Sequence, residues 1–195
     1  YRGNRMVNWC PHCNTSISDA EVEYEEKDGS FWHLLYPVKE TGEMLELATT
    51  RPETMLGDTA VAINGDDPRY AHLHGCHVVL PLLNKEIPIV CDEHADMTKG
   101  TGVVKITPAH DPNDFEVGLR HDLPIVRVFT YDGRMTGAAD KAAADALFAA
   151  GKNTVNEPHV LDCGKYAGMT TLEARKAILA DLKEGGFLKE IEPLK

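Results

Sequence analysis

Residues 100–114 read Gly-Thr-Gly-Val-Val-Lys-Ile-Thr-Pro-Ala-His-Asp-Pro-Asn-Asp, and this order predicts a strand that leads directly into a helix. The strand is expected over Val103–Thr107. Because side chains alternate along a strand, Val103, Lys105 and Thr107 share one of its faces. The pattern therefore places a cation and a hydroxyl on the same side, beside the start of the helix.

Asp111 is the expected N-cap of that helix. An aspartate there accepts hydrogen bonds from the unpaired amides of the first turn, and Pro112 suits the first helical position because it has no amide to satisfy. Asp114 falls in the first turn, where the positive end of the helix stabilises a carboxylate. Both aspartates therefore have a purely structural interpretation, which spacing alone favours. The helix is expected to end near His121.

Short β-type runs separated by turn residues occupy much of the remaining chain. With Val103–Thr107 they make seven expected strands, the others being Phe31–Val38, Met44–Ala48, Thr59–Ile63, His77–Leu82, Ile87–Cys91 and Ile125–Phe129. So many short strands predict a barrel or a folded sheet. The fold class is therefore expected to be α+β, mainly β with peripheral helices, and barrel-like.

Two further helices are expected after the seventh strand. Ala139–Ala150 is rich in alanine, which has the strongest helix propensity. A capping box starts the second helix, Thr170–Glu184. Between the two, Asn153–Cys163 is expected to be an irregular loop, and Phe187–Ile191 is expected to be a closing strand.

Hydropathy and net charge bear on the cellular location of the chain and on its contact with nucleic acid. No run of about 18 apolar residues occurs and no signal peptide is recognisable, so we expect a cytoplasmic protein with no membrane partner. The net charge of −11, from 20 basic and 31 acidic residues, has the wrong sign for gripping nucleic acid along a broad face. A nucleic-acid substrate is therefore expected to touch this chain over a small area.

Five cysteines, an odd number with one close pair, argue against a disulfide framework. Val7–Cys13 is predicted to be a knuckle-like turn, in which Cys10 and Cys13 have the spacing of a zinc knuckle. A closed structural zinc site needs about four ligands, and no second Cys-x-x-Cys pair is present in the sequence. We therefore expect at most a half-site there, and predict no bound metal and no cofactor.

A second polar segment, residues 48–54, follows an apolar strand and reads Ala-Thr-Thr-Arg-Pro-Glu-Thr. Its threonines and its arginine can hold a hydroxylated, charged ligand. Thr49, Thr50, Arg51 and Thr54 are therefore candidate binding residues. Taken by itself, the segment is better explained as an ordinary transition from strand to turn.

Together, the two segments resemble the editing domain shared by the valyl-, isoleucyl- and leucyl-tRNA synthetases. In that family a threonine-rich strand and loop faces a Gly-Thr-Gly segment that ends in an aspartate. The amino-acid sequence of residues 51–54 and 105–111 is most similar to that of the valyl members. Residues 7–13, 18–24 and 164–168 are similar to them as well.

Because the resemblance covers nearly the whole chain, residues 1–195 are expected to form a single editing domain. The composition agrees, since 43% hydrophobic residues in a chain of this length can bury one sizeable core. Residues 1–20, which hold the Cys-x-x-Cys pair, are expected to be a connecting segment. Residues 138–162 are longer than the connection expected there in the family, and are identified as an insertion.

The resemblance implies hydrolysis of threonine mistakenly attached to valine tRNA. The implied partners are the 3′ end of that tRNA carrying threonine and the remainder of the synthetase. Asp114 is implied to hold the substrate's ammonium, while the loop around the aminoacyl group and the terminal adenosine is lined by Thr49, Thr50, Arg51 and Thr54. Two roles are left, recognition of the threonine hydroxyl and orientation of the attacking water. We expect Lys105, Thr107 and Asp111 to share them. The expected catalytic residues are Lys105, Asp111 and Asp114.

Other functions stay open at this point. The chain lacks His-Ile-Gly-His and Lys-Met-Ser-Lys-Ser, the signatures of the synthetic site, so no ATP-dependent aminoacylation is expected. A zinc-knuckle RNA-binding module without hydrolase activity is one alternative, and the acidic balance argues against it. A domain that keeps the fold but has lost editing is another, and the presence of Asp114, Lys105 and Thr54 argues against that.

Overall fold

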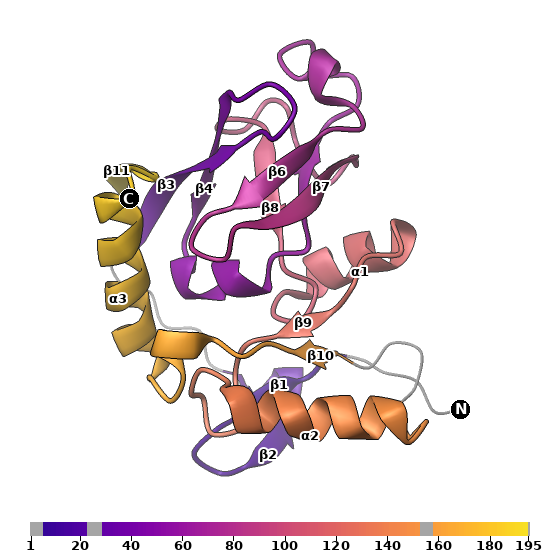
Figure 1. Ribbon diagram of the computed structural model, residues 1–195, viewed down its shortest axis with the longest axis vertical. Helices are drawn as coiled ribbons and strands as arrows, with labels where there is room; N and C mark the ends of the chain where they lie inside the picture. Colours follow the sequence, from indigo (N-terminus) through magenta and orange to yellow (C-terminus); the bar gives the residue numbers. More distant parts are fainter. Residues whose placement is uncertain (1–5, 23–28, 153–157, 195) are drawn as a thin grey trace.

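The computed structural model describes residues 6–22, 29–152 and 158–194. Its body consists of two β-sheets with helices around them (Figure 1). The strand order is β11-β3-β4 in one sheet and β6-β7-β5-β8 in the other. The predicted class, mainly β with peripheral helices, is confirmed.

The three-stranded sheet is antiparallel throughout. It consists of β3 (Ser30–Pro37), β4 (Met44–Thr49) and β11 (Leu188–Pro193). Alternate side chains of β3 point inward, so that Leu34 and Tyr36 are completely buried. The closing strand expected near the end of the chain is therefore present, and it pairs with β3.

The four-stranded sheet is mixed. It consists of β5 (Ala60–Ile63), β6 (His77–Leu80), β7 (Lys85–Cys91) and β8 (Val103–Ile106). Strand β5 pairs in parallel with β7, and the other pairs are antiparallel. Strand β5 is buried at every position, because it lies inside the sheet. A turn with positive φ angles at Leu82 (69°) and Asn84 (51°) ends β6 earlier than predicted.

The three predicted helices are confirmed, with boundaries that differ by at most one residue: α1 (Pro112–Arg120), α2 (Ala138–Ala149) and α3 (Thr171–Glu184). Helix α3 runs beside β11 and adds Ile178 and Leu182 to the main core (Figure 1). Helix α2 lies below the sheets in both views and buries none of its residues. No helix in the described part of the chain is long and apolar enough to cross a membrane.

Short elements connect these layers. Four 3₁₀ helices are described: η1 (Asp19–Glu21), η2 (Pro52–Gly57), η3 (Ala71–Leu73) and η4 (Gly164–Tyr166). Two small sheets pair β1 (Asn8–Cys10) with β2 (Thr15–Ile17), and β9 (Val126–Arg127) with β10 (His159–Val160).

The small sheets correct two predictions and place a third within a hairpin. The knuckle-like turn expected over Val7–Cys13 is part of the β1–β2 hairpin. The seventh strand, expected over Ile125–Phe129, shortens to β9 and pairs in parallel with β10, outside both main sheets. Strand β10 lies in the expected irregular loop Asn153–Cys163, of which residues 153–157 lie outside the described residues. A local sequence pattern predicts extended backbone. It does not predict which strand, from elsewhere in the sequence, will pair with it.

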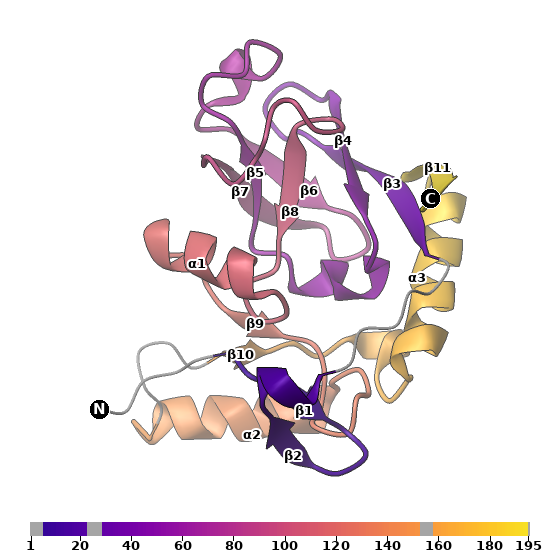
Figure 2. The same cartoon turned by 180° about the vertical axis from the view of Figure 1, so that it is seen from behind.

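The two main sheets join along one side. A bridge between Val38 and Val78, and a hydrogen bond of 2.9 Å from the Lys39 amide to the His77 carbonyl, connect the end of β3 to β6. On the other side β4 lies beside β8 (Figure 2), but among the described residues no backbone ladder joins these two strands. The arrangement is a folded sheet and not a closed barrel, which leaves space for side chains between β4 and β8.

Arg175 of α3 fixes the short helix η2. Its guanidinium donates two hydrogen bonds of 2.9 Å to the carboxylate of Glu53, which is 2% exposed. We expect Arg175→Ala to lower the free energy of unfolding by about 3 kcal/mol, because Glu53 stays buried without its main partner. Chemical denaturation measures this change, with Lys176→Ala, exposed on the same helix, as the control. Equal stability of the two variants would contradict the prediction.

Candidate functional site

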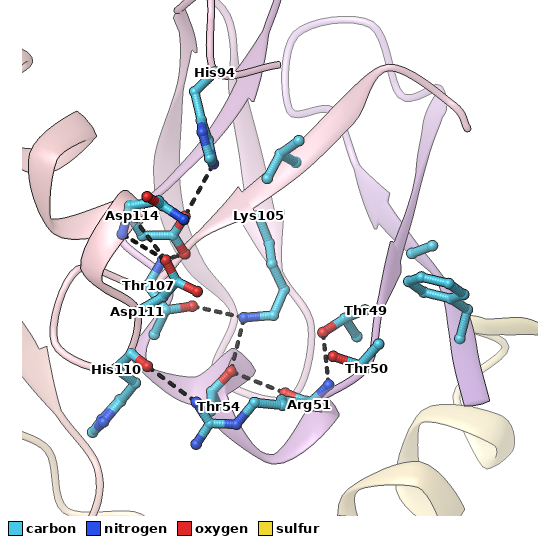
Figure 3. Close-up of a pocket in the computed structure, with 14 residues that line it drawn as sticks. Thr49, Thr50, Arg51, Thr54, His94, Lys105, Thr107, His110, Asp111 and Asp114 are labelled. Atoms are coloured by element: carbon cyan, nitrogen blue, oxygen red, sulfur yellow. Dashed lines mark hydrogen bonds and ion pairs between the residues drawn. The ribbon is translucent and has the colours of Figure 1, made fainter. Parts of the chain in front are cut away.

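A cavity of about 260 Å³ opens between β4 and β8, in the gap that the two sheets leave (Figure 3). Its walls come from the ends of these strands, from η2 and from the first turn of α1. The lining residues are Phe31, Ala48, Thr49, Thr50, Arg51, Thr54, His94, Val104, Lys105, Thr107, His110, Asp111, Asn113 and Asp114. All eight residues predicted for the site are among them, so the fold brings the two predicted segments together.

Lys105 lies in the wall of this cavity with its ammonium fully paired. The side chain is about nine-tenths buried, and Nζ donates to Thr54 Oγ1 at 2.9 Å, to Asp58 Oδ1 at 2.9 Å and to Thr107 Oγ1 at 2.6 Å. An ammonium has three hydrogens to donate, so the protein itself uses all of them. Lys105 therefore orients two hydroxyls of the cavity wall and does not extend an unpaired charge into the cavity.

Asp58 belongs to this network, and sequence reasoning missed it. The residue is 1% exposed and accepts hydrogen bonds from the hydroxyls of Tyr36, at 2.7 Å, and Thr107, at 2.5 Å. Burial raises the pKa of the Asp58 carboxyl, and the neighbouring Lys105 charge and the hydrogen bonds oppose that rise. Asp58 directly follows η2, where no spacing pattern distinguishes it from an ordinary loop aspartate.

Asp111 has the capping role that its position predicted. Its Oδ1 accepts from the amides of Asn113, at 2.8 Å, and Asp114, at 3.0 Å, and its backbone is extended as an N-cap requires. The residue also lines the cavity. The structural and the functional interpretations of Asp111 are therefore compatible.

Asp114 turns back from α1 toward the end of β8 and is 7% exposed. Its Oδ2 accepts the Thr107 amide at 3.0 Å, and its Oδ1 lies 3.4 Å from Nε2 of His94 (Figure 3). Burial raises the pKa of Asp114 to about 6, and the charge of Asp111 adds to the rise, while the Thr107 amide opposes it. The backbone thus fixes one carboxylate oxygen in a cavity wall, and the carboxylate can pair with a cation there.

The threonine loop between β4 and η2 is shaped by its own hydroxyls. The Arg51 amide donates to Thr49 Oγ1 at 3.1 Å, and Thr54 Oγ1 donates to the Arg51 carbonyl at 2.9 Å. The Arg51 guanidinium is half exposed and donates to the His110 carbonyl at 3.0 Å, which ties the loop to the turn before α1. Thr50 is exposed at the edge of the cavity.

Two histidines line the cavity without having been predicted. Nε2 of His110 accepts the Val128 amide at 3.0 Å, and the ring packs edge-on against Phe129 with centroids 4.8 Å apart. Burial lowers the pKa of His110 to about 3, so its ring is neutral and structural. His94 lies in the loop between β7 and β8 and faces Asp114. No motif marks His94, because its partner is 20 residues away in the sequence.

The two knuckle cysteines lie on either side of a tight turn. The Cys13 amide donates to Cys10 Sγ at 3.3 Å, and hydrogen bonds at this turn lower the pKa of Cys10. Within the described residues, three potential metal ligands gather at His33, Glu46 and Glu190, on the three-stranded sheet and away from the cavity. Cys10 and Cys13 do not form such a group of three with any described residue, although His12 Nδ1 lies 3.9 Å from Cys13 Sγ.

Known proteins match the chain along its whole length. The family model described as "Leucyl-tRNA synthetase, editing domain" matches residues 71–183. Relatives named "Valine--tRNA ligase" include the Clostridium tetani protein, 54% identical over 192 residues (98% of this chain), and the Lactococcus lactis protein, 50% identical over 195 residues (100%). Each match covers 19% of the relative, so the chain spans about a fifth of the length of these curated relatives.

The fold also matches a solved structure, the ternary complex of Agrobacterium radiobacter K84 agnB2 LeuRS with tRNA and LeuAMS. The TM-score is 0.55 at 19% sequence identity, over 86% of this chain and 20% of that one. At this identity the match bears on the fold alone.

The family model covers more than half of the chain and includes β8 and α1, which carry Lys105, Asp111 and Asp114. The valine--tRNA ligase matches extend the similarity to β4 and the threonine loop, on the other side of the cavity. The chain therefore belongs to the family of aminoacyl-tRNA synthetase editing domains, in the form found within valine--tRNA ligases.

Proposed function

We propose that this chain hydrolyses the ester that joins threonine to mischarged valine tRNA, as the editing domain of a valyl-tRNA synthetase. The observation that carries the proposal is the carboxylate of Asp114, which is buried in the wall of a cavity otherwise rich in oriented hydroxyls. Such a cavity suits a ligand that carries an ammonium and a hydroxyl. A threonyl ester has both groups.

Asp114 binds the substrate's ammonium in this proposal. The Thr107 amide holds Oδ2 at 3.0 Å, so the direction of the carboxylate is set before a substrate enters. Charge-assisted hydrogen bonds of this kind are about twice as strong as neutral ones. Fixing the amino group restricts the ester carbonyl to a small volume, which is the main requirement for attack by a positioned water.

The hydroxyls of Thr54 and Thr107 select threonine over valine. Each hydroxyl donates its hydrogen within the protein, to the Arg51 carbonyl and to Asp58 respectively, and each accepts one hydrogen from Lys105. One lone pair remains on each oxygen, so either can accept a hydrogen bond from the substrate's hydroxyl. Valine fills the same volume without that hydrogen and leaves the lone pair desolvated, at a cost of about 1–3 kcal/mol.

The chemical step is hydrolysis by water. The water oxygen bonds to the ester carbonyl carbon and the bond from that carbon to the ribose oxygen breaks. The water gives up one proton and the ribose oxygen takes up one, so that threonine and a free ribose hydroxyl are the products. The neighbouring ribose hydroxyl already activates the ester, so oriented water and dipoles suffice without a covalent nucleophile. We assign the orientation of this water to Asp111, whose Oδ1 is held by two amides of α1.

The proposed partners are the 3′ end of valine tRNA carrying threonine and the remainder of the synthetase, in the cytoplasm. Within the chain we propose residues 1–20 as a connecting segment and residues 138–162 as an insertion. Helix α2 supports the second assignment, because it buries none of its residues and so adds nothing to the core.

The alternative, a zinc-knuckle RNA-binding module, has no specific observation in its favour. His12 Nδ1 lies 3.9 Å from Cys13 Sγ, but among the described residues the two cysteine sulfurs and a third ligand atom do not all come within 4.8 Å of one another. Such a module also leaves the buried carboxylate of Asp114 without a role.

Asp114→Ala is expected to lower single-turnover deacylation of threonyl-tRNA by at least about 10²-fold, because the ammonium loses its charged partner. The melting temperature should change little, since the variant loses one hydrogen bond, to the Thr107 amide. Glu173→Ala is a matched control, because Glu173 occupies the same first-turn position in α3. A variant that melts early but hydrolyses normally would make Asp114 a purely structural residue.

Lys105→Ala is expected to slow hydrolysis or reduce threonine selectivity, and also to lower the free energy of unfolding by about 3–5 kcal/mol, because Asp58 keeps a buried charge without its partner. The double variant Lys105→Met with Asp58→Asn removes both charges and should regain part of that stability. If the double variant is stable and its rates on threonyl and valyl esters are normal, Lys105 has no part in the reaction.

Deacylation should depend on pH through Asp114. Only the ionised carboxylate pairs with an ammonium, so kcat/KM is expected to rise as pH increases through about 6, where burial places the pKa of Asp114. Asp111→Asn removes a like charge, which should move this rise to lower pH. Profiles of kcat/KM for the two proteins measure the effect, and superimposable profiles would show that Asp114 does not control them.

A further inference from the structure

His94 lies in the loop between β7 and β8, and the proposed function gives it no role. It lines the cavity of the candidate site and also a neighbouring hollow of about 790 Å³, and Asn113 is the other residue that lines both spaces. The His94 side chain is 29% exposed and points toward Asp114 (Figure 3). A ligand in the cavity can therefore reach the imidazole.

The backbone of His94 is fixed by its neighbours in a tight turn. The His94 amide donates to Asp92 Oδ1 at 2.9 Å, and the Ala95 amide donates to the Asp92 carbonyl at 3.1 Å. Arg120 of α1 holds the Asp92 carboxylate with two hydrogen bonds, of 2.9 and 3.0 Å. Asn64 Nδ2 donates to the Ala95 carbonyl at 3.1 Å, and Ala95 is completely buried. The loop thus presents the imidazole from a fixed position.

Two atoms that can accept hydrogen bonds meet at the end of the His94 ring. Nε2 lies 3.4 Å from Oδ1 of Asp114. Oδ2 of Asp114 accepts the Thr107 amide, whereas in the described part of the chain neither Oδ1 nor Nε2 has a hydrogen bond. A neutral imidazole with its hydrogen on Nδ1 leaves a lone pair on Nε2. Because 3.4 Å is less than two hydrogen-bond lengths of about 2.9 Å, one donor nitrogen can reach both atoms.

An ammonium group matches this pair of acceptors. It has three hydrogens and no lone pair, so it can donate to Oδ1 and to Nε2 at the same time. Lys105, whose ammonium belongs to the same cavity wall, cannot be this donor, because Thr54, Asp58 and Thr107 take its three hydrogens. The donor therefore has to come from a ligand.

We infer that His94 is a second acceptor for the substrate's ammonium, so that Asp114 and His94 together recognise a free α-amino group. The inference rests on the proposed function, which places the ammonium at Asp114 and assigns no acceptor to its remaining hydrogens. His94 thereby adds specificity for aminoacyl esters over esters of acids that lack the amino group. A His94 that is protonated and only balances the charge of Asp114 has the opposite effect, because it competes with the ammonium.

Two ligands that cannot be hydrolysed separate these roles. The first is adenosine that carries threonine on its ribose through an amide in place of the ester. The second is the same compound with a hydrogen in place of the ammonium. Their Kd values are measured by calorimetry with the 195-residue chain at about pH 8, above the pKa of about 6 that burial gives Asp114.

The variants are chosen to remove or to keep the acceptor. His94→Ala removes it, while His94→Gln keeps an acceptor oxygen at a similar reach and cannot become a cation. His74→Ala is the control, because His74 is exposed and lines neither the cavity nor the neighbouring hollow. Melting temperatures of all four proteins show whether each variant is folded.

His94→Ala should raise the Kd of the threonyl ligand about tenfold, because a hydrogen bond from a charged donor is lost, and should leave the Kd of the ligand without an ammonium unchanged. His94→Gln and His74→Ala should match the unmodified chain with both ligands. Equal losses for the two ligands would overturn the inference and make His94 a residue that only shapes the cavity. Unchanged or tighter binding of the threonyl ligand by His94→Ala would overturn it as well.

Hydrolysis of threonyl-tRNA by the same proteins separates this inference from the proposed function. If the threonyl ligand depends on His94 as expected but the unmodified chain hydrolyses no ester, the proposed function fails and the acceptor role of His94 stands. If the ester is hydrolysed while the threonyl ligand binds equally well to His94→Ala, the inference fails and the proposed function stands. A chain that binds neither ligand overturns the inference.

Discussion

The ammonium of Lys105 and the carboxylate of Asp58 meet at 2.9 Å inside this protein, and the chemistry of the cavity depends on that pair. Burying two charges costs several kcal/mol for each ion unless hydrogen bonds complete their surroundings. Here Tyr36, Thr54 and Thr107 complete them. The network ties β3, η2 and β8 together. It also fixes which way each hydroxyl donates, so the cavity offers lone pairs in set positions.

The cavity exists because the two sheets stay open along one side. If a ladder joined β4 to β8, backbone would occupy the space that side chains of the threonine loop and of β8 now line. The open edge is stabilised from outside the sheets, by Arg175 on Glu53 and by Arg51 on the His110 carbonyl. Arg175, which does not line the cavity, thus helps to hold the loop that forms half of its wall.

An acidic chain can act on a polyanion when the contact is small and local. The cavity is lined by one half-exposed guanidinium, that of Arg51, and by the carboxylates of Asp111 and Asp114. If the proposed function holds, long-range attraction of RNA comes from outside these 195 residues, which span about a fifth of the length of the valine--tRNA ligase relatives. The proposed recognition of an ammonium and a hydroxyl does not need a basic surface.

The sequence by itself determined the elements and the two segments of the site. Strand alternation, the Asp111 cap and the Thr170 cap act within one turn or one strand, so neighbouring residues predict them; of the expected capping box at Thr170, the structure shows only the bond from the Glu173 amide to the Thr170 hydroxyl. The resemblance to editing domains then named eight residues, and all eight line one cavity. Tertiary structure decided the rest. Tertiary packing pairs β9 with β10, Asp58 with Lys105 and Trp9 with Tyr131, and it leaves β4 and β8 unpaired. In each case the residues lie far apart in the chain. No local periodicity encodes such contacts, because packing of the whole chain creates them.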